Sequence, residues 1–314
     1  MTAFIVRRLL SLIPVALVVG TVVFALVHMI PGDPVTVMLG SGASQSDIQR
    51  LRSQMRLDEP LVTQYFSWLT QTLQGNLGNS VVQQRPVLEI IGERLEPTLV
   101  LAVSATLVGV LLGVPLGITA ASRAGTLLDR VLIIIAVAGI SIPYFWLGLL
   151  GIIVFSVELR WLPATGYLSP FQDGLASVRY LILPVLALGI SQAGFVARLS
   201  RTATLQVLQE NYIRTARAKG VTARSVMLSH ALRNVLIPIV TVVGLSFGIL
   251  LGGAIVTETV FGIPGMGRLI LQAIQQRDYP IIQGALLLVA MFNVLVNLVV
   301  DMVYIVIDPR ISYS

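Results

Sequence analysis

The segment NYIRTARAKGVTARSVMLSHALRN, residues Asn211–Asn234, is a strongly basic interruption in a chain that is otherwise mostly apolar. It contains no Asp or Glu, and its permanent positive charges are those of Arg214, Arg217, Lys219, Arg224 and Arg233. Helix-forming residues lie on both sides of Gly220, and glycine readily adopts the positive φ that ends a helix and turns the chain. The pattern therefore predicts two helices joined by a turn at Gly220.

The composition of the chain is typical of a membrane protein. Of its 314 residues, 55% are hydrophobic and 11% are charged, and the mean hydropathy is +0.87. A soluble domain of this length would need far more charge on its surface. Cysteine is absent, which excludes disulfides and thiolate metal sites. Because the net charge of +6 is gathered in loops beside apolar runs, we expect contact with membrane lipid and no binding of nucleic acid.

Six segments are apolar over the length of about 20 residues that a helix needs to cross a bilayer. We expect transmembrane helices at Leu9–Ile30, Thr98–Ala120, Val131–Val157, Tyr180–Leu199, Val235–Val256 and Ile281–Ile307. The first is too long for a signal-peptide core, and no small-residue cleavage site follows it, so we expect it to be retained. The predicted fold class is an all-α integral membrane protein with six transmembrane helices.

The distribution of Lys and Arg predicts the orientation, because cytoplasmic loops carry the excess of these residues. With the N-terminus inside, the cytoplasmic segments hold twelve of the 21 Lys and Arg residues: Arg7, Arg8, Arg123, Arg130, Arg198, Arg201, Arg214, Arg217, Lys219, Arg224, Arg233 and Arg310. The outer segments hold most of the Asp and Glu residues. Both termini are therefore predicted to be cytoplasmic.

The chain is expected to have three parts: residues 1–30 with the first span, an extracytoplasmic loop at 31–97, and a core of five spans at 98–314 that includes a cytoplasmic loop at 200–234. The loop is too long to be a simple connector. Three helices are expected in it, beginning at the capping-box pair Ser46 and Gln49, at Pro60 and at Pro86. It is either an outer cap on the bundle or a docking surface for an extracytoplasmic partner, and the two are compatible.

A second external segment, ETVFGIPGMGRLILQAIQQRDYP at Glu258–Pro280, is rich in Gly and Pro near its start. The pattern predicts a tight re-entrant turn followed by a short amphipathic helix. Backbone that leaves the helix near a membrane is tolerated only where protein or a water-filled cavity covers it. We therefore expect an outer gate here, with the candidate residues Glu258, Gly262, Pro264, Gly265 and Gly267.

The last span carries a polar stripe, because Asn293, Asn297 and Asp301 recur at intervals of four residues and share one helical face. A carboxylate at the centre of a membrane helix costs about 2.5–3.5 kcal/mol, so it should face protein or water. The stripe either forms hydrogen bonds between helices or lines a translocation pathway.

The sequence lacks the arrangements of residues that the commonest enzyme sites use. Lys219 is the single lysine and is followed by Gly220, so the chain cannot contain a phosphate-binding G-x-x-x-x-G-K-[ST] loop. His28 and His230 lie on separate elements without acidic neighbours, which argues against a zinc site. We expect no catalytic, cofactor-binding or metal-binding residue in this chain.

The basic segment resembles the EAA loop of the integral permeases of ABC importers, in the oligopeptide, dipeptide and nickel group. In the loop pattern E-A-A-x3-G-x9-I-x-L-P, the matching residues are Ala216, Gly220 and Leu232. The chain departs from the pattern at Arg214, Thr215, His230 and Arg233. RTARAKG followed by HALRNVLIP resembles the form that the peptide-permease branch uses.

Four further motifs extend the resemblance over nearly the whole chain. They are RRLLSLIPV with PGDP at Pro31–Pro34, GNLGNS at Gly75–Ser80, ETVFGIPGMGRL at Glu258–Leu269, and DPRI at Asp308–Ile311. Together they resemble the first of the two permeases of a peptide importer.

The resemblance implies a type I importer in a bacterial inner or cell membrane. Two related permeases would form the pathway, two cytoplasmic ATPases using ATP and Mg would drive it, and an extracytoplasmic binding protein would deliver the substrate. The ATPase-coupling residues would be Arg214, Thr215, Ala216, Arg217, Ala218, Lys219 and Gly220. Dipeptides or oligopeptides are the expected substrates, and nickel chelates, glutathione and haem are alternatives within the group.

Two other interpretations of the basic segment remain open. It could be a positive-inside anchor against anionic lipid, or the topology signal of a self-sufficient secondary transporter or channel. Asp301 is the one carboxylate expected inside a span, which is few for proton coupling. The ordered turn at Gly220 also favours the importer.

Overall fold

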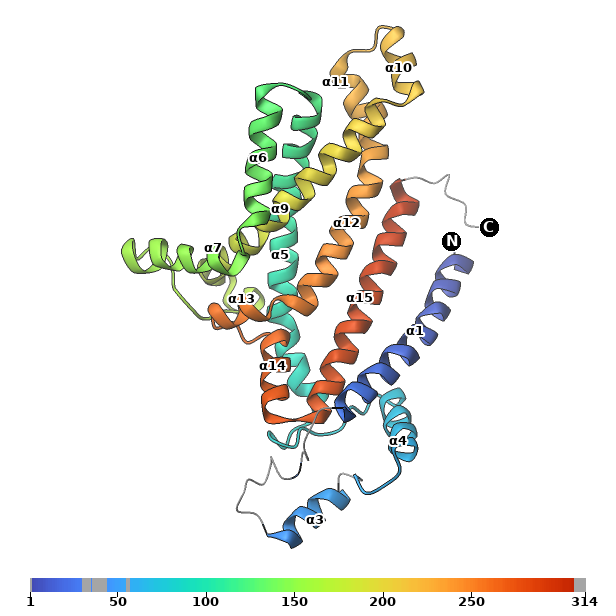
Figure 1. The fold of residues 1–314 in the computed structure, drawn as a ribbon, viewed down its shortest axis with the longest axis vertical. Helices are drawn as coiled ribbons and strands as arrows, with labels where there is room; N and C mark the ends of the chain where they lie inside the picture. Colours follow the sequence, from blue (N-terminus) through green and yellow to red (C-terminus); the bar gives the residue numbers. More distant parts are fainter. Residues whose placement is uncertain (1, 30–34, 36–43, 55–56, 308–314) are drawn as a thin grey trace. The chain divides into compact units, whose positions relative to one another are not determined.

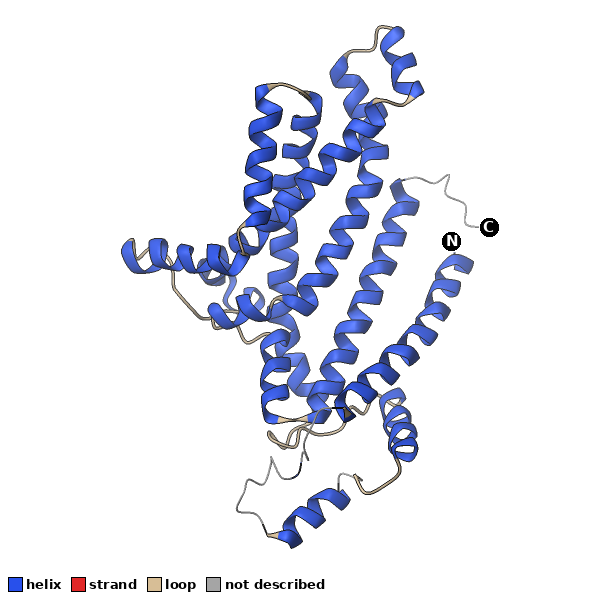
Figure 2. Cartoon of the chain, viewed as in Figure 1, coloured by secondary structure: helices blue, strands red, loops and turns tan. Residues whose placement is uncertain are grey.

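The computed structural model describes residues 2–29, 35, 44–54 and 57–307, and these residues form helices without a strand (Figure 2). The chain divides into two compact units. Unit 1 consists of Met1–Thr98 and Pro264–Val294, and unit 2 consists of Leu99–Ile263 and Leu295–Ser314.

Within the described residues, four stretches of helix are long and apolar enough to cross a membrane, and a bent pair of helices makes up to five. The four contain α5 (Val87–Ser122), α9 (Val178–Leu208), α12 (Leu232–Gly253) and α15 (Tyr279–Ile307). A shorter apolar helix, Ile13–His28, belongs to α1 (Thr2–His28) and corresponds to the predicted first span. The predicted apolar segments are thus largely helical, and two of the predicted helices differ from the structure.

The expected transmembrane helix at Val131–Val157 is not continuous. This region forms α6 (Leu127–Ser141) and a second helical piece, α7 (Tyr144–Gly151) with the π-helical Ile152–Glu158, and the two are bent by 90°. Pro143 explains the break. The residue before a proline is pushed out of the helical region, and Ile142 accordingly has an extended ψ of 124°.

The expected helix at Pro86–Leu95 is present and leads into the second span, but it has no end at Leu95, because α5 runs without a break through both. Its 36 residues make a helix of about 54 Å, longer than the hydrocarbon core of a bilayer. Pro97 lies inside α5 and does not end it. Membrane helices tolerate an internal proline when neighbouring groups satisfy the freed backbone.

Two short helices of unit 1 lie in the predicted extracytoplasmic loop. α3 (Gln45–Gln54) begins earlier than expected, because Ser44 rather than Ser46 caps it: the Ser44 hydroxyl accepts a hydrogen bond of 3.2 Å from the Asp47 amide. α4 (Leu61–Leu73) begins after Pro60, as predicted.

α4 packs on the end of α1 within unit 1. The Tyr65 hydroxyl lies 2.7 Å from the Thr21 hydroxyl, and the Nε2 of His28 lies 3.2 Å from the Oε1 of Gln64. The ring of Phe24 also meets that of Tyr65 edge to face. The motifs PGDP and DPRI lie outside the described residues.

The core of unit 1 joins the start of α5 to α14 (Met266–Gln276) and the first turns of α15. α14 has the apolar stripe expected of a surface helix, and its buried side chains are those of Met266, Leu269, Ile270 and Ala273. The predicted amphipathic helix of the second external segment is therefore present.

Unit 2 is a helical bundle in which α9 packs against α6, α7 and α12 (Figure 1). One core of this unit contains buried side chains of α5 and α9 together with Phe261 and Ile263. At the other end of this bundle the chain leaves α9, forms α10 (Asn211–Ala218), and returns through α11 (Ala223–Ser225) to α12 (Figure 1).

Candidate functional site

The basic segment folds as two helical pieces joined at Gly220, as predicted. α9 ends at Leu208, a turn of two residues follows, and α10 begins at Asn211. Gly220 has a φ of +81°, in the left-handed region that favours glycine. The return starts where the Thr222 hydroxyl caps α11 by accepting a hydrogen bond of 3.4 Å from the Ser225 amide. It continues as the π-helical Val226–Ala231 into α12.

A small apolar core holds α10 against this return. Ile213 and Ala216 lie one turn apart on α10 and are both buried. They pack with Val226 and Ala231 of the π-helical turn, and Val221 and Met227 cover the same cluster. The Asn234 side-chain amide also donates a hydrogen bond of 2.6 Å to the Tyr212 hydroxyl.

The seven predicted coupling residues divide into one buried and six exposed positions. Ala216 points into the small core. The exposed residues are Arg214, Thr215, Arg217, Ala218, Lys219 and Gly220. α10 thus combines an anchored apolar side with an outward cationic side, which can receive a partner that carries acidic groups.

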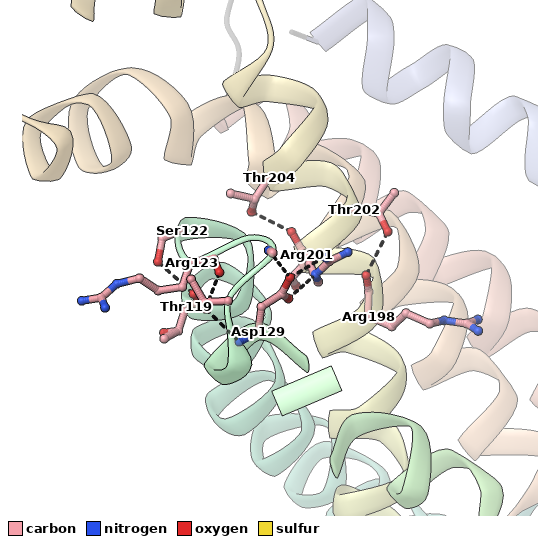
Figure 3. Close-up of polar contacts among 11 residues, drawn as sticks. Thr119, Ser122, Arg123, Asp129, Arg198, Arg201, Thr202 and Thr204 are labelled. Atoms are coloured by element: carbon pink, nitrogen blue, oxygen red, sulfur yellow. Dashed lines mark hydrogen bonds and ion pairs between the residues drawn. The ribbon is translucent and has the colours of Figure 1, made fainter. Parts of the chain in front are cut away.

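An ion pair connects α6 to α9 below this segment (Figure 3). The Nε of Arg201 lies 2.7 Å from one carboxylate oxygen of Asp129, and the Nη2 lies 2.8 Å from the other. The amide of Gly125 donates a further hydrogen bond of 2.9 Å to the same carboxylate. The Thr126 hydroxyl caps α6 by accepting from the Asp129 amide at 3.4 Å. The carboxylate is thus fully engaged.

Glycines bring the backbones of α5 and α9 close together. A Cβ atom on Gly113 would lie 2.6 Å from the carbonyl oxygen of Ala193, and one on Gly117 would lie 2.3 Å from that of Ala197. Real Cβ contacts are not this short, so both positions require glycine. The two helices run parallel here, since contacts advance by four residues on both.

The candidate outer gate residues are divided between the two units. In unit 2, α13 (Ile255–Val260) holds Glu258, which is fully buried. Gly262 follows with a φ of +65°, which confirms the tight turn. The carbonyl of Phe261 accepts a hydrogen bond of 2.8 Å from Gly166.

The other three gate candidates, Pro264, Gly265 and Gly267, lie in unit 1 at the start of α14. There the amide of Met266 donates to the Thr98 hydroxyl at 2.8 Å. The role of this segment as a gate stays a prediction.

The polar stripe lies on α15, as predicted. The Asn293 side chain is half-buried and donates to the carbonyl of Val289 in its own helix at 3.1 Å. Asn297 is exposed and Asp301 is half-buried. Whether the stripe lines a pathway stays a prediction.

The family models match almost the whole chain. A model described as "Binding-protein-dependent transport system inner membrane component" matches residues 113–313. Its N-terminal companion, "Binding-prot-dependent transport system membrane comp, N-term", matches residues 1–102. The chain belongs to this family of ABC-importer permeases. The resemblance inferred from the basic segment and the four further motifs is confirmed, and the permease is a multi-pass component of the inner membrane.

Curated relatives match the permease over its full length. It is 43% identical to the "Probable peptide ABC transporter permease protein y4tP" of Sinorhizobium fredii, over 100% of both chains. It is 45% identical to the "Glutathione transport system permease protein GsiC" of Escherichia coli K12, again over 100% of both chains.

Solved structures share the fold of the permease. An inward-facing MetNI methionine ABC transporter matches with a TM-score of 0.56 and 20% identity, over 70% of this chain and 97% of that one. A chain of an amino acid ABC transporter matches with a TM-score of 0.51 and 19% identity, over 69% of this chain and 94% of that one. The predicted type I importer architecture is confirmed.

Two features of the permease were not predicted from its sequence. The spacing of Gly109, Gly113 and Gly117 is the small-xxx-small pattern of closely packed membrane helices, so a signal for the α5–α9 contact was present. The Asp129–Arg201 pair spans 72 residues. Its partners are ordinary loop-side charges in the sequence, and no local pattern selects them.

Proposed function

We propose that this permease carries short peptides, glutathione among them, across the inner membrane after an extracytoplasmic binding protein delivers them. The observation that supports this is the full-length match to two permeases named for peptide and for glutathione transport. Glutathione is itself a tripeptide, so one substrate class covers both names. Nickel chelates and haem, the alternatives that the motif resemblance implied, have no counterpart among these names.

We propose further that α10 is the element on which a cytoplasmic ATPase acts. Arg214, Arg217 and Lys219 give it an exposed cationic side, while Ile213 and Ala216 anchor its other side to the permease. A force on α10 therefore reaches α9 through the two-residue turn and α12 through the π-helical turn. ATP-driven closure of two ATPases would then change the arrangement of the spans.

The remaining partners complete the proposed importer. A paralogous permease would supply the second half of the pathway, and ATP and Mg would be bound by the ATPases rather than by this chain. Within this chain, Asn297 and Asp301 would contribute to the pathway from α15, and the turn at Gly262 would contribute to its outer gate.

The test is transport by the assembled importer in proteoliposomes. The permease is purified with its co-purifying subunits, and uptake of labelled dipeptide, tripeptide and glutathione is measured with and without ATP and the binding protein. We expect peptide uptake that requires both. Competition by unlabelled nickel chelate or haem but not by peptide would reassign the substrate. Uptake by the permease alone, without an ATPase, would overturn the importer role.

A further inference from the structure

Asp129 and Arg201 are not among the seven proposed coupling residues, yet Arg201 lies near the end of α9 that leads into α10. We propose that Asp129 and Arg201 are positioning residues for energy coupling: their ion pair fixes α6 to α9, so that a displacement of α10 moves both helices together. The inference rests on the proposed role of α10.

The geometry of the pair is well suited to fixing an orientation. The guanidinium of Arg201 uses Nε and Nη2 on separate oxygens of Asp129, at 2.7 and 2.8 Å. Two parallel hydrogen bonds between planar groups tolerate little rotation or sliding. The Gly125 amide at 2.9 Å holds the carboxylate from the side of the α5–α6 turn. A single-point contact would hold the helices together without setting their register.

Burial argues for a positioning role rather than a simple gain in stability. The side chain of Asp129 is 5% exposed and that of Arg201 is 28% exposed. Desolvation offsets much of the attraction in a buried ion pair, so an apolar pair would often serve stability as well. The best-attested use of such a pair is to select one register among several.

A second contact shows the same register two turns away. A Cβ atom on Gly194 of α9 would lie 2.3 Å from the carbonyl oxygen of Ala136 of α6. From Arg201 to Gly194, and from Asp129 to Ala136, the separation along each helix is about 10 Å. The two helices are antiparallel, and the two contacts are separated by the same distance on both helices. Breaking the ion pair leaves the contacts of Ala136 with Gly194 and of Gly139 with Ile190 further along the helices, and frees the start of α6 to move relative to α9.

The position of the pair places it between α10 and the rest of the bundle. Arg201 precedes the end of α9 at Leu208 by about two turns, and α10 follows after two residues. Any force on α10 that travels along α9 reaches Arg201 before it reaches the contact between Gly194 and Ala136 deeper in the bundle. The pair is thus the first point at which α6 can be moved with α9.

The chain offers a matched control on the same helix. Arg198 lies one turn from Arg201, and its side chain is exposed and points away from Asp129 (Figure 3). R198Q removes the same charge from α9 without touching the pair. It therefore reports any effect of the charge on insertion or orientation.

The test measures substrate transported per ATP hydrolysed by the complete importer, at equal amounts of assembled complex. We expect D129N to keep ATP hydrolysis within about twofold of the unmodified importer and to lower transport per ATP at least tenfold. D129N/R201Q, in which no unpaired charge remains buried, should show the same loss. R198Q should leave the ratio unchanged. The ratio separates positioning from stability, because loss of folded protein lowers both activities in parallel.

Three results would contradict the inference or the proposed function on which it rests. An unchanged ratio in D129N/R201Q overturns the inference, and so does failure of both variants to assemble, which makes the pair a stability element only. If the unmodified importer shows no ATP-dependent transport, the proposed function falls and this inference falls with it. If the unmodified importer transports normally and the Asp129 variants transport as much substrate per ATP as it does, the inference alone is wrong.

Discussion

The carbonyl oxygen of Ala197 lies 2.3 Å from the point where a Cβ atom on Gly117 would be placed, so α5 and α9 meet backbone to backbone. In a membrane the association of helices depends on close van der Waals packing, because the surrounding lipid is as apolar as the side chains. Glycine allows this approach, at the cost of a residue that is intrinsically poor in helices. The contact lies at the end of unit 2 near Arg201, whose amide nitrogen is 2.9 Å from the same point.

Gly117→Ala should destabilise the permease. The added methyl group forces α5 away from α9, and overpacking of this kind costs about 1–3 kcal/mol. The thermal midpoint of the detergent-purified chain should fall. Gly92→Ala is the matched control on the same helix, since nothing lies within 4 Å of a Cβ there. That variant should be unchanged or gain up to about 1 kcal/mol. Equal midpoints for Gly117→Ala and the unmodified chain would contradict the close contact.

Gly220→Val should abolish transport while membrane insertion stays intact. Nothing lies within 4 Å of a Cβ at this position, so the effect comes from the φ of +81° alone. The left-handed conformation costs a non-glycine residue about 1–2 kcal/mol, and a β-branched residue is especially disfavoured in it. Valine at this position should therefore leave this conformation and reorient α10. Uptake per amount of inserted permease is the measurement. Gly220→Asn should retain much of the activity, because Asn tolerates positive φ, and normal uptake by Gly220→Val would remove α10 from the mechanism.

Local signals in the sequence were sufficient for the elements that end at special residues. Gly220 and Gly262 have the positive φ that their patterns predict, and Pro60 precedes α4 as expected. Pro143 was an equally good signal for the bend between α6 and α7, but hydropathy averaged over a long window hides a break between two apolar helices. Ser46 and Gln49 have capping-box spacing, but the hydroxyl that accepts from a backbone amide at the start of α3 is that of Ser44.

Long-range pairings could not be predicted in this way. Several arginines lie beside apolar segments in the sequence, and each could be the partner of Asp129. The register of α6 against α9 determines that the partner is Arg201. The same holds for Ser80 and Asp278, which are 198 residues apart and form a buried hydrogen bond of 2.5 Å in unit 1. Helical periodicity identifies a buried face, whereas the neighbour of that face is set by the packing of the whole bundle.

Asp278→Asn should loosen the loop that follows Ser80. The carboxylate of Asp278 accepts from the Ser80 hydroxyl and from the amides of Val81 and Val82, at 2.5, 3.4 and 3.3 Å. A carboxamide replaces one acceptor by a donor and leaves a buried donor unpaired, which costs about 1–3 kcal/mol.

Hydrogen exchange of the Val81 and Val82 amides should rise by one to two orders of magnitude. Asp58→Asn is the control, because the side chain of Asp58 is 53% exposed and its ion pair with Arg52 lies at the surface. Unaltered exchange in Asp278→Asn would show that the loop is held by its other contacts.

The triple variant R214Q/R217Q/K219Q should weaken binding of the ATPase and leave the fold of α10 unchanged. All three side chains are exposed, and the buried Ile213 and Ala216 still anchor the helix. Exposed ion pairs contribute about 0.5 kcal/mol each, so the loss of three corresponds to about a tenfold weaker affinity. The measurement is binding of the purified ATPase to the permease in nanodiscs.

The difference in affinity between the triple variant and the unmodified permease should shrink as salt rises, because salt screens the attraction that the variant has lost. Arg224→Gln removes an exposed charge from the neighbouring α11 and should bind normally. Equal affinities for the triple variant and the unmodified permease at low salt would show that the cationic side of α10 does not face the ATPase.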